Sequence, residues 1–277
     1  RRLKGFSPHE YVVLNACESL PGVDRSEDLV ARELEAMGFA FTGSDAEVLA
    51  LSWDKPRVKR LLAEQGVLTP RFRLFRSASG NGWRTFPAIV KPAYEHCSLG
   101  VTREAVVLDA RELLSRVSYV LDTFGQPALV EDFIDGREFH VTVWGAEELE
   151  VLPPAEMDLT SFADIHDRLC TYDSKFVANS AAYEAVGIKA PALLSPEEKE
   201  AVRRASLGAY RALGCRDYAR MDIRLRDGAV YVLDINPNAD IQAGNSTACA
   251  AAAAGYSFGA MASRLVRLAA RRHPRFR

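Results

Sequence analysis

The chain has 277 residues, of which 48% are hydrophobic and 26% charged, and a formal net charge of −2. This length is enough for two or three compact lobes, and the composition is that of an ordinary globular protein, which excludes disordered and fibrous classes. The near-neutral charge provides no broad basic surface, so nucleic-acid binding is disfavoured, and the arginine-rich end at 271–277 is interpreted as a solvated terminus.

The cysteines and apolar runs bear on where the protein works. Five cysteines are scattered without paired metal spacing, and their odd number argues against a secreted disulfide framework. The alanine-rich run 248–254 is too short and too weakly apolar to cross a bilayer, and no signal-peptide pattern opens the chain. We therefore expect a cytoplasmic protein without membrane contact. Because the chain begins at Arg1 without a methionine, we also expect a fragment or a trimmed product.

The first third of the chain predicts alternating strands and helices. Residues 11–14 form a short apolar run typical of a strand, and 26–37 have helical spacing with Gly38 as the stop. A second helix is predicted from Ser52 or Asp54 to Gly66. Residues 88–90 then predict a short buried strand between two prolines.

The last third contains the clearest helix signals. Ser195, Pro196 and Glu198 form an N-cap, a first-turn proline and a capping-box glutamate, which predict a helix to about Gly214. A final amphipathic helix places its apolar residues on one face, namely Met261, Leu265, Val266 and Leu268. The alternation of strands and helices predicts an α/β fold.

Residues 218–237 predict two strands around an Asp-Gly turn, with acidic residues in apolar surroundings. Asp234 and Asn236 share a face by the two-residue period of a strand. Together with Asp222 they offer the hard oxygen ligands that magnesium prefers. The alternative is a surface hairpin whose aspartates face water or pair with Arg220 and Arg224.

The register of this hairpin decides whether the aspartates can meet. Asp222 and Asp234 share a face only if the connection has an odd number of residues or a bulge shifts the pairing. We therefore predict a three-residue connection of Arg226, Asp227 and Gly228, with the glycine in the left-handed conformation.

Residues 128–143 predict a strand, a glycine-containing turn and a second strand. Glu131 and Glu138 flank the turn, where their carboxylates could accept hydrogen bonds from an amine or from ribose hydroxyls. Phe133 and Ile134 could provide an apolar slot for a purine. The alternative is an edge hairpin with polar punctuation.

Residues 87–101 predict a strand, a lysine and a loop containing Ser98 and Gly100. The ammonium group of Lys91 suits phosphate oxygens, and backbone amides near a glycine can surround them. Taken alone, Lys91 is equally well explained as a surface lysine.

In this order the three segments resemble the ATP-grasp superfamily, and within it the D-alanine-D-alanine ligase branch. Further segments carry the same resemblance along the chain, namely Leu14-Asn15, 41–44, Asp54-Lys55, 172–176, Pro191-Ala192 and 219–222. The resemblance implies two α+β lobes with a nucleotide between them. The implied boundaries are a truncated amino-terminal α/β lobe at 1–44, a central lobe at 45–133 and a carboxyl-terminal lobe with the metal site at 134–277.

The resemblance also implies roles for individual residues. Lys55 and Lys91 would approach the phosphates of ATP, Glu131 and Glu138 would contact adenine and ribose, and Lys175 would reach the γ-phosphate from a mobile loop as a binding and catalytic group. Arg220 would stabilise the oxyanion of a tetrahedral intermediate. The remaining implied residues are Ser98, Phe133, Ile134 and Leu233 around the nucleotide and Asp222, Asp234 and Asn236 around two magnesium ions, with manganese as a substitute.

The implied reaction joins a small carboxylate to an amine through an acyl-phosphate, with an amino acid or small peptide as the substrate class. Two alternatives stay open. One is a true D-alanine-D-alanine or D-alanine-D-lactate ligase, and the other is an ATP-binding module without catalysis. Similar ligases suggest a homodimer.

The chain departs from the family pattern mainly at the amino substrate. Asp234 stands where the family usually has glutamate, and Phe176 where D-alanine-D-alanine ligases typically have tyrosine. Asp240 follows Asn236 where the family has a Ser-Leu pair that holds the substrate carboxylate. We expect Asp240 at the substrate end of the site, favouring a cation, or as a cap of the turn near Gly244 and Asn245. The family's first strands and glycine-rich loop are missing before Leu14.

Overall fold

The computed structural model describes residues 2–23, 25–79, 82–176 and 185–276, and these residues form three sheets. In the six-stranded sheet, all pairs are antiparallel. Its strands, in spatial order, are β10 (Gly187–Lys189), β9 (Ala155–Asp158), β7 (Arg137–Gly145), β11 (Asp217–Arg226) and β12 (Ala229–Asn236), with β8 (Leu149–Val151) paired to β7. The four-stranded sheet has the order β3 (Phe72–Phe75), β6 (Ala128–Asp132), β4 (Ala88–Pro92), β5 (Val106–Val107). The third sheet pairs β1 (Val12–Val13) in parallel with β2 (Ala40–Phe41).

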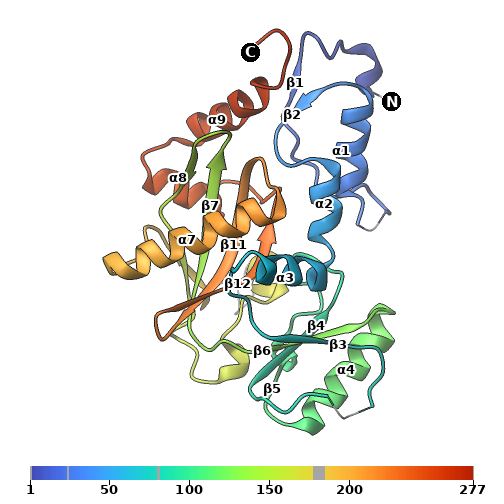
Figure 1. Ribbon diagram of the computed structural model, residues 1–277, viewed down its shortest axis with the longest axis vertical. Helices are drawn as coiled ribbons and strands as arrows, with labels where there is room; N and C mark the ends of the chain where they lie inside the picture. The colour runs from blue at the N-terminus through green and yellow to red at the C-terminus, as the bar shows by residue number, and fades with distance from the viewer. Residues whose placement is uncertain (1, 24, 80–81, 177–184, 277) are drawn as a thin grey trace.

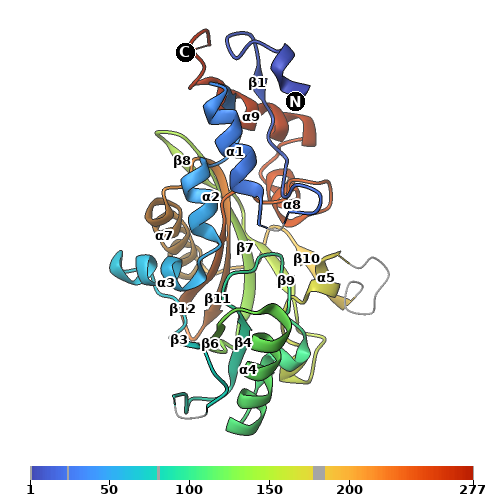
Figure 2. The same cartoon turned by 90° about the vertical axis from the view of Figure 1, so that its right-hand side faces the viewer.

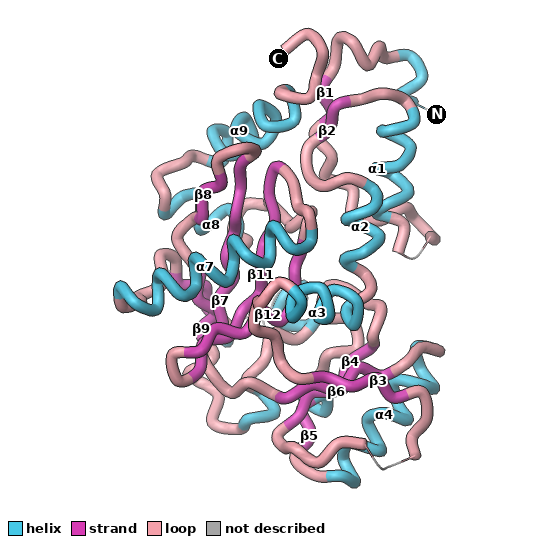
Figure 3. The backbone as a smooth tube through the Cα atoms, in the orientation of Figure 1, coloured by secondary structure: helices cyan, strands magenta, loops and turns pink. Residues whose placement is uncertain are grey.

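Helices pack against the two larger sheets. α7 (Pro196–Leu213) covers one face of the six-stranded sheet, and α8 (Ser246–Ala253) and α9 (Phe258–Ala270) lie on its other side (Figure 2). α4 (Ala110–Phe124) packs on the four-stranded sheet at the opposite end of the molecule from both termini (Figure 1). The other described helices are α1 (Glu27–Ala36), α2 (Ala46–Ser52), α3 (Lys55–Glu64) and α5 (Tyr172–Phe176), and the 3₁₀ helices are η1 (Arg2–Gly5), η2 (Arg103–Ala105) and η3 (Ile165–Asp167). Figure 3 shows α1 beside the strands β1 and β2. Within the described ranges, no helix is long and apolar enough to cross a membrane.

The predicted helix ends are confirmed. α3 begins after Asp54, whose side chain accepts a hydrogen bond from the backbone amide of Arg57 at 3.0 Å. α7 begins with a full capping box between Ser195 and Glu198 and ends at Gly214 in the left-handed conformation. These local signals fix where each helix starts, which in turn fixes which side chains face the sheet.

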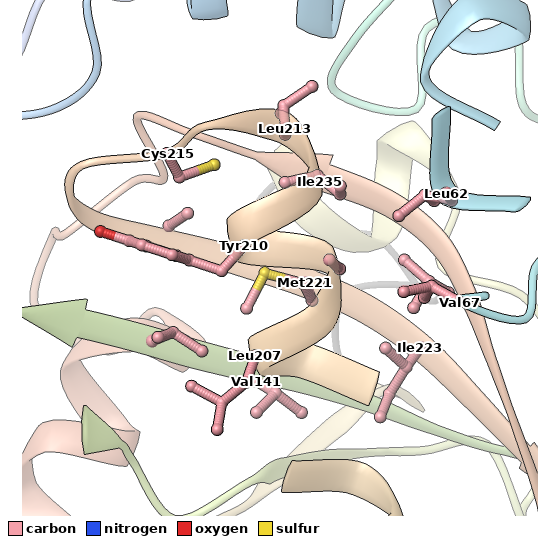
Figure 4. Close-up of a cluster of buried hydrophobic side chains, with 14 of the residues drawn as sticks. Leu62, Val67, Val141, Leu207, Tyr210, Leu213, Cys215, Met221, Ile223 and Ile235 are labelled. Carbon is pink, nitrogen blue, oxygen red and sulfur yellow. The ribbon is translucent and has the colours of Figure 1, made fainter. Parts of the chain in front are cut away.

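The main core lies between α7 and the six-stranded sheet. Alternate residues of β11, such as Met221 and Ile223, point toward α7, where they contact Leu207 and Tyr210 (Figure 4). Val141 of β7 belongs to the same cluster. Because neighbouring residues of a strand point to opposite faces, the residues between these apolar ones face away from the core. On β11 those residues are charged: Arg220, Asp222 and Arg224.

The hairpin between β11 and β12 differs from the predicted connection. Arg226 pairs with Ala229, so the turn has only the two residues Asp227 and Gly228, both with positive φ, of 52° and 75°. The three-residue prediction is therefore wrong, although the left-handed glycine is confirmed. A bulge instead shifts the register, since Ile223 pairs with Val232 whereas Asp222 pairs with Asp234. The two aspartates are thus brought opposite each other by the second of the two routes.

The segment between β6 and β7 is not the edge hairpin of the alternative interpretation. β6 belongs to the four-stranded sheet and β7 to the six-stranded sheet, so residues 133–136 carry the chain from one sheet to the other. A Cβ on Gly136 would overlap the carbonyl oxygen of Leu225 in β11. Glycine is therefore required by the close approach of this crossover to β11.

The amino-terminal unit is fixed to the large sheet through a buried carboxylate. Asp217, at the start of β11, accepts a hydrogen bond from the backbone amide of Gly43 at 3.0 Å and is paired with Arg272. The guanidinium of Arg272 also donates to the carbonyl oxygen of Phe41 at 2.6 Å. These contacts hold the amino-terminal residues beside the sheet.

We expect the substitution Gly136→Ala to lower the free energy of unfolding by about 1–3 kcal/mol, because backbone must move to accept the added methyl group. The matched control is Gly259→Ala in α9, where the added Cβ meets open space. Urea unfolding of both variants measures the difference. Equal stability of Gly136→Ala and the wild type would contradict the close approach.

Candidate active site

One cavity of about 380 Å³ collects nearly all of the predicted site residues. Residues from both large sheets line it, together with the loop after β4 and the segment after β12. The predicted residues that the cavity brings together are Lys55, Lys91, Ser98, Glu131, Phe133, Ile134, Glu138, Arg220, Asp222, Leu233, Asp234, Asn236 and Asp240. Lys175 and Phe176 lie on α5, but their side chains are outside the described part of the structure, so their roles stay predictions.

At the hairpin end of the cavity, each aspartate is paired with a cation. The Lys55 ammonium contacts the Asp234 carboxylate, and Arg220 donates two hydrogen bonds to Asp222, from Nε at 2.7 Å and from Nη2 at 3.1 Å. Asn236 donates through its side chain to the Arg220 carbonyl oxygen at 3.4 Å. The three predicted metal ligands therefore face one cavity with two cations among them.

Charge pairing offsets the cost of burial at this end. Burial alone would raise the pKa of Asp234, but Lys55, His96 and Lys91 together hold that pKa below its ordinary value. Burial would likewise lower the pKa of Arg220, whereas the charge and hydrogen bonds of Asp222 raise it. The carboxylates of Asp222 and Asp234 and the amide oxygen of Asn236 make a donor set that fits magnesium.

Glu131 is held between two lysines on the wall formed by the four-stranded sheet. Its carboxylate oxygens lie 3.1 Å from the Lys59 ammonium and 3.1 Å from the Lys91 ammonium, and the residue is only 1% exposed. Burial lowers the pKa of Lys59 to about 8 despite the opposing charge of Glu131. For Lys91, burial is outweighed by Glu131 and Asp234, and its pKa is raised. The Lys91 ammonium thus lines the cavity with its charge favoured by neighbouring carboxylates.

Glu138 is positioned by a cross-strand arginine. Arg224 of β11 lies opposite Glu138 of β7, and its Nε and Nη2 are 2.9 Å and 2.7 Å from the Glu138 Oε2. The same guanidinium donates to the Ile134 carbonyl oxygen at 2.7 Å and lies 4.7 Å from the centre of the Phe133 ring. Arg224 therefore fixes both the carboxylate and the apolar slot that the sequence pattern predicted.

The loop after β4 closes over the cavity with an unusual backbone. Cys97 and Ser98 both have φ of 57°, the left-handed region that these residues seldom adopt, and the Ser98 hydroxyl donates to the Cys170 carbonyl oxygen at 3.0 Å. His96 stacks edge-on against Trp53 at 4.3 Å. Burial, followed by the charge of Lys55, lowers the pKa of His96 to about 4, so the imidazole is neutral at pH 7.

Three further acidic residues line the cavity, namely Glu18, Glu27 and Asp240. Burial raises the pKa of Glu27 to about 7, and burial together with the charge of Asp240 raises that of Glu18. Asp240 also accepts hydrogen bonds from the backbone amide of Gln242 at 2.8 Å and from the Asn245 side chain. Asp240 therefore lines the cavity and also makes the hydrogen bonds expected of the alternative role in the turn.

Sequence reasoning missed several lining or supporting residues. Lys59 lies one turn after Lys55 on α3, so helical spacing could have indicated it. Arg224 and His140 follow Asp222 and Glu138 by the two-residue period of their strands. Glu18 and Glu27 offered no local signal, because only the fold brings them to this cavity.

Comparison with known proteins identifies the family. A model of the D-ala D-ala ligase C-terminus matches residues 73–267. A D-alanine-D-alanine ligase from Desulforudis audaxviator is 32% identical over 86% of this chain and 76% of its own length. An uncharacterized protein, y4sG, from Sinorhizobium fredii is 34% identical over 95% of this chain and 75% of its own length.

Solved structures support the same fold. A Bacillus anthracis D-alanine-D-alanine ligase complexed with ATP superposes with a TM-score of 0.68 at 23% identity, over 87% of this chain and 74% of that one. The VanG D-Ala:D-Ser ligase from Enterococcus faecalis gives a TM-score of 0.70 at 23% identity, over 87% and 68% of the two chains. The predicted α/β ATP-grasp fold is confirmed. The chain belongs to the D-alanine-D-alanine ligase family of ATP-grasp enzymes, the ligases that form carbon-nitrogen bonds.

Proposed function

We propose that this enzyme joins a small carboxylate to a cationic amine through an acyl-phosphate, with ATP bound between the four-stranded and six-stranded sheets. The observation that carries the proposal is the single cavity in which Asp222 and Asp234 face Lys55, Lys91 and Arg220. Carboxylates for a metal and cations for phosphates are the groups that phosphoryl transfer requires in one place.

The proposed steps assign one task to each group. A carboxylate oxygen of the substrate attacks the γ-phosphorus of ATP, and ADP leaves. Lys55 and Lys91 neutralise phosphate oxygens, joined by Lys175 if its predicted role holds. The amine then attacks the acyl carbon, Arg220 stabilises the resulting oxyanion, and phosphate leaves as the amine gives up its proton.

Magnesium fits the donor set of Asp222, Asp234 and Asn236, and when bound it supplies charge neutralisation for the transferred phosphoryl group. In this structure Lys55 forms an ion pair with Asp234, and Arg220 forms one with Asp222. We propose that these cations turn toward the substrates when metal binds. We propose that two magnesium ions bind here and that manganese can replace them.

Contacts among the lining residues support a proposed position for the nucleotide. Adenine would lie against Phe133, Ile134 and Leu233, with Glu138 held by Arg224 at the ribose and Glu131 beside it. Ser98 would lie near the phosphates.

We keep the lobes 1–44, 45–133 and 134–277 as proposed units. We propose a cytoplasmic enzyme because ATP is its substrate and because none of the five cysteines, all within the described residues, forms a disulfide. A homodimer also remains a proposal.

The acidic residues Glu18, Glu27 and Asp240 in the cavity support the proposed class of amine substrate. Glu18, Glu27 and Asp240 would repel an acceptor carboxylate and stabilise an ammonium, so we propose a diamine, a basic side chain or an amidated terminus. Phe176 is proposed to contact the same substrate. The second candidate is D-alanine-D-alanine ligation, which the names of curated relatives favour, or D-alanine-D-lactate ligation.

We expect ATP turnover to yield ADP and phosphate, because the acyl-phosphate route breaks the bond to the γ-phosphorus. Chromatography of the nucleotide products, with pooled amino acids and amines present, measures this. Formation of AMP and pyrophosphate would exclude the proposed route.

We expect Asp234→Asn to lower kcat by about a hundredfold or more, because it removes the negative charge of a proposed metal ligand, worth several kcal/mol. The matched control is Asp234→Glu, which keeps the charge and restores the residue usual in the family. Glu should retain turnover while Asn loses it. Circular dichroism checks folding, since Asn also leaves the Lys55 ammonium without its carboxylate. Near-normal turnover of Asp234→Asn at low magnesium would refute the metal assignment.

We expect Asp240→Asn and Asp240→Ala to reduce kcat/KM for cationic acceptors about tenfold, which corresponds to roughly 1.4 kcal/mol. Asn can still accept the hydrogen bond from Gln242 but not also the one from Asn245, so stability should fall in both variants and further in Ala. Asp227→Asn, at an exposed turn, controls for the change in net charge. A panel of D- and L-amino acids and diamines is the readout. Unchanged acceptor preference with only a stability loss would assign Asp240 to the turn.

A further inference from the structure

A second set of metal-ligating side chains lies in the same cavity, apart from the carboxylates of the hairpin. Glu138, His140 and Cys170 each offer one ligand atom, these atoms all lie within 4.8 Å of one another, and all three residues are buried. All three also line the cavity. The set mixes a carboxylate, an imidazole and a thiol, which distinguishes it from an ordinary acidic cluster.

The fold holds these three residues in place from two directions. Glu138 and His140 are two residues apart on β7, so they point to the same face of the sheet. Cys170 precedes α5, and its carbonyl oxygen accepts the hydrogen bond from Ser98. The set therefore depends on the six-stranded sheet for two ligands and on a loop contact for the third.

The imidazole also has the supporting contact that metal-binding histidines use. His140 Nδ1 lies 2.9 Å from the Ser246 hydroxyl. A proton on Nδ1 donated to this oxygen leaves the lone pair on Nε2, and such an outer contact fixes the tautomer and the orientation of the ring. Glu138 contacts Arg224 through Oε2, and a carboxylate can keep an arginine on one oxygen while the other ligates a metal.

We propose that Glu138, His140 and Cys170 form a binding site for Zn²⁺ or a similar transition-metal ion. Zinc binds sulfur, nitrogen and oxygen ligands at about 2.0–2.3 Å in tetrahedral geometry, so ligand atoms of one ion lie about 3–4 Å apart. The observed upper limit of 4.8 Å exceeds this spacing by about 1 Å, so the ligands would draw together when the ion binds. The thiol releases its proton to solvent on binding, and the thiolate and carboxylate together balance the charge of the ion.

This site differs in chemistry from the magnesium site beside it. Magnesium prefers oxygen ligands, whereas a thiolate selects softer ions. His140 Nε2 nevertheless lies 3.7 Å from Asp222 Oδ1, and Glu138 is the proposed ribose contact. An ion bound here would share the space of the nucleotide, so zinc and nucleotide should exclude each other. This last step alone rests on the proposed function.

Cobalt(II) tests the site because a cobalt-thiolate bond gives a charge-transfer absorption that oxygen and nitrogen ligands do not give. The purified, reduced protein is titrated with Co²⁺ alone, and a colorimetric chelator then measures displacement of Co²⁺ by Zn²⁺. The variants are Cys170→Ser and His140→Gln, and the matched control is Cys249→Ser, which removes a thiol that does not line the cavity. Thermal unfolding in excess chelator confirms that each variant folds.

We expect the absorption in the wild type and in Cys249→Ser, its loss in Cys170→Ser, and about tenfold or greater weakening of Co²⁺ binding in His140→Gln. Excess Mg²⁺-ADP should reverse the absorption. No thiolate absorption in the wild type, or its persistence in Cys170→Ser, would overturn the proposed site. Absorption that depends on Cys170 in a protein without ligase activity would leave the metal site standing and refute only the proposed function.

Discussion

The active-site end of the large sheet depends on one extra residue in β12. Val232 and Ile235 are three residues apart, yet both belong to the core under α7. A regular strand would place Asp234 on the face of Val232 and bury it in that core. The bulge at Leu233 reverses the alternation of side chains along β12. Asp234 therefore pairs with Asp222 on the face of the cavity. A bulge of this kind re-aims a side chain at the cost of one ladder pairing, and here it separates an apolar face from a charged one.

Buried charge is the second feature that organises the cavity. Four pairs or triads neutralise one another inside it: Lys55 with Asp234, Arg220 with Asp222, Arg224 with Glu138, and Lys59 and Lys91 with Glu131. Removing one member of such a buried pair typically costs about 3–5 kcal/mol, because the other charge is left without a partner. Each member of these groups therefore depends on an internal partner of opposite charge.

Much of this fold could be predicted from the sequence because its signals are local. The capping box at Ser195, the N-cap at Asp54 and the left-handed Gly228 each depend on a few neighbouring residues. The two-residue period correctly placed Asp234 and Asn236 on one face. The bulge escaped prediction because nothing in Val232 or Leu233 marks it, and the pairing of Asp222 with Asp234 is decided by packing against α7.

Contacts between segments far apart in the chain could not be predicted from the sequence either. The crossing from β6 to β7 looked like a hairpin, since two strands joined by a short glycine-containing turn usually pair with each other. Glu18 and Glu27 reach the cavity only because Asp217 and Arg272 fix the amino-terminal unit to the large sheet. The family resemblance indicated by motif many residues that line the cavity, whereas the acidic residues Glu18 and Glu27 and the group of Glu138, His140 and Cys170 required the structure.

In the proposed reaction, the carboxylate substrate is phosphorylated before the amine attacks. An isotope experiment tests this order with an amino acid that stimulates ATP turnover and carries heavy oxygen in its carboxylate. During turnover with an amine acceptor, we expect one labelled oxygen in each released phosphate, detected by mass spectrometry, because the bridging oxygen leaves with phosphorus. Phosphate free of label would contradict the acyl-phosphate mechanism.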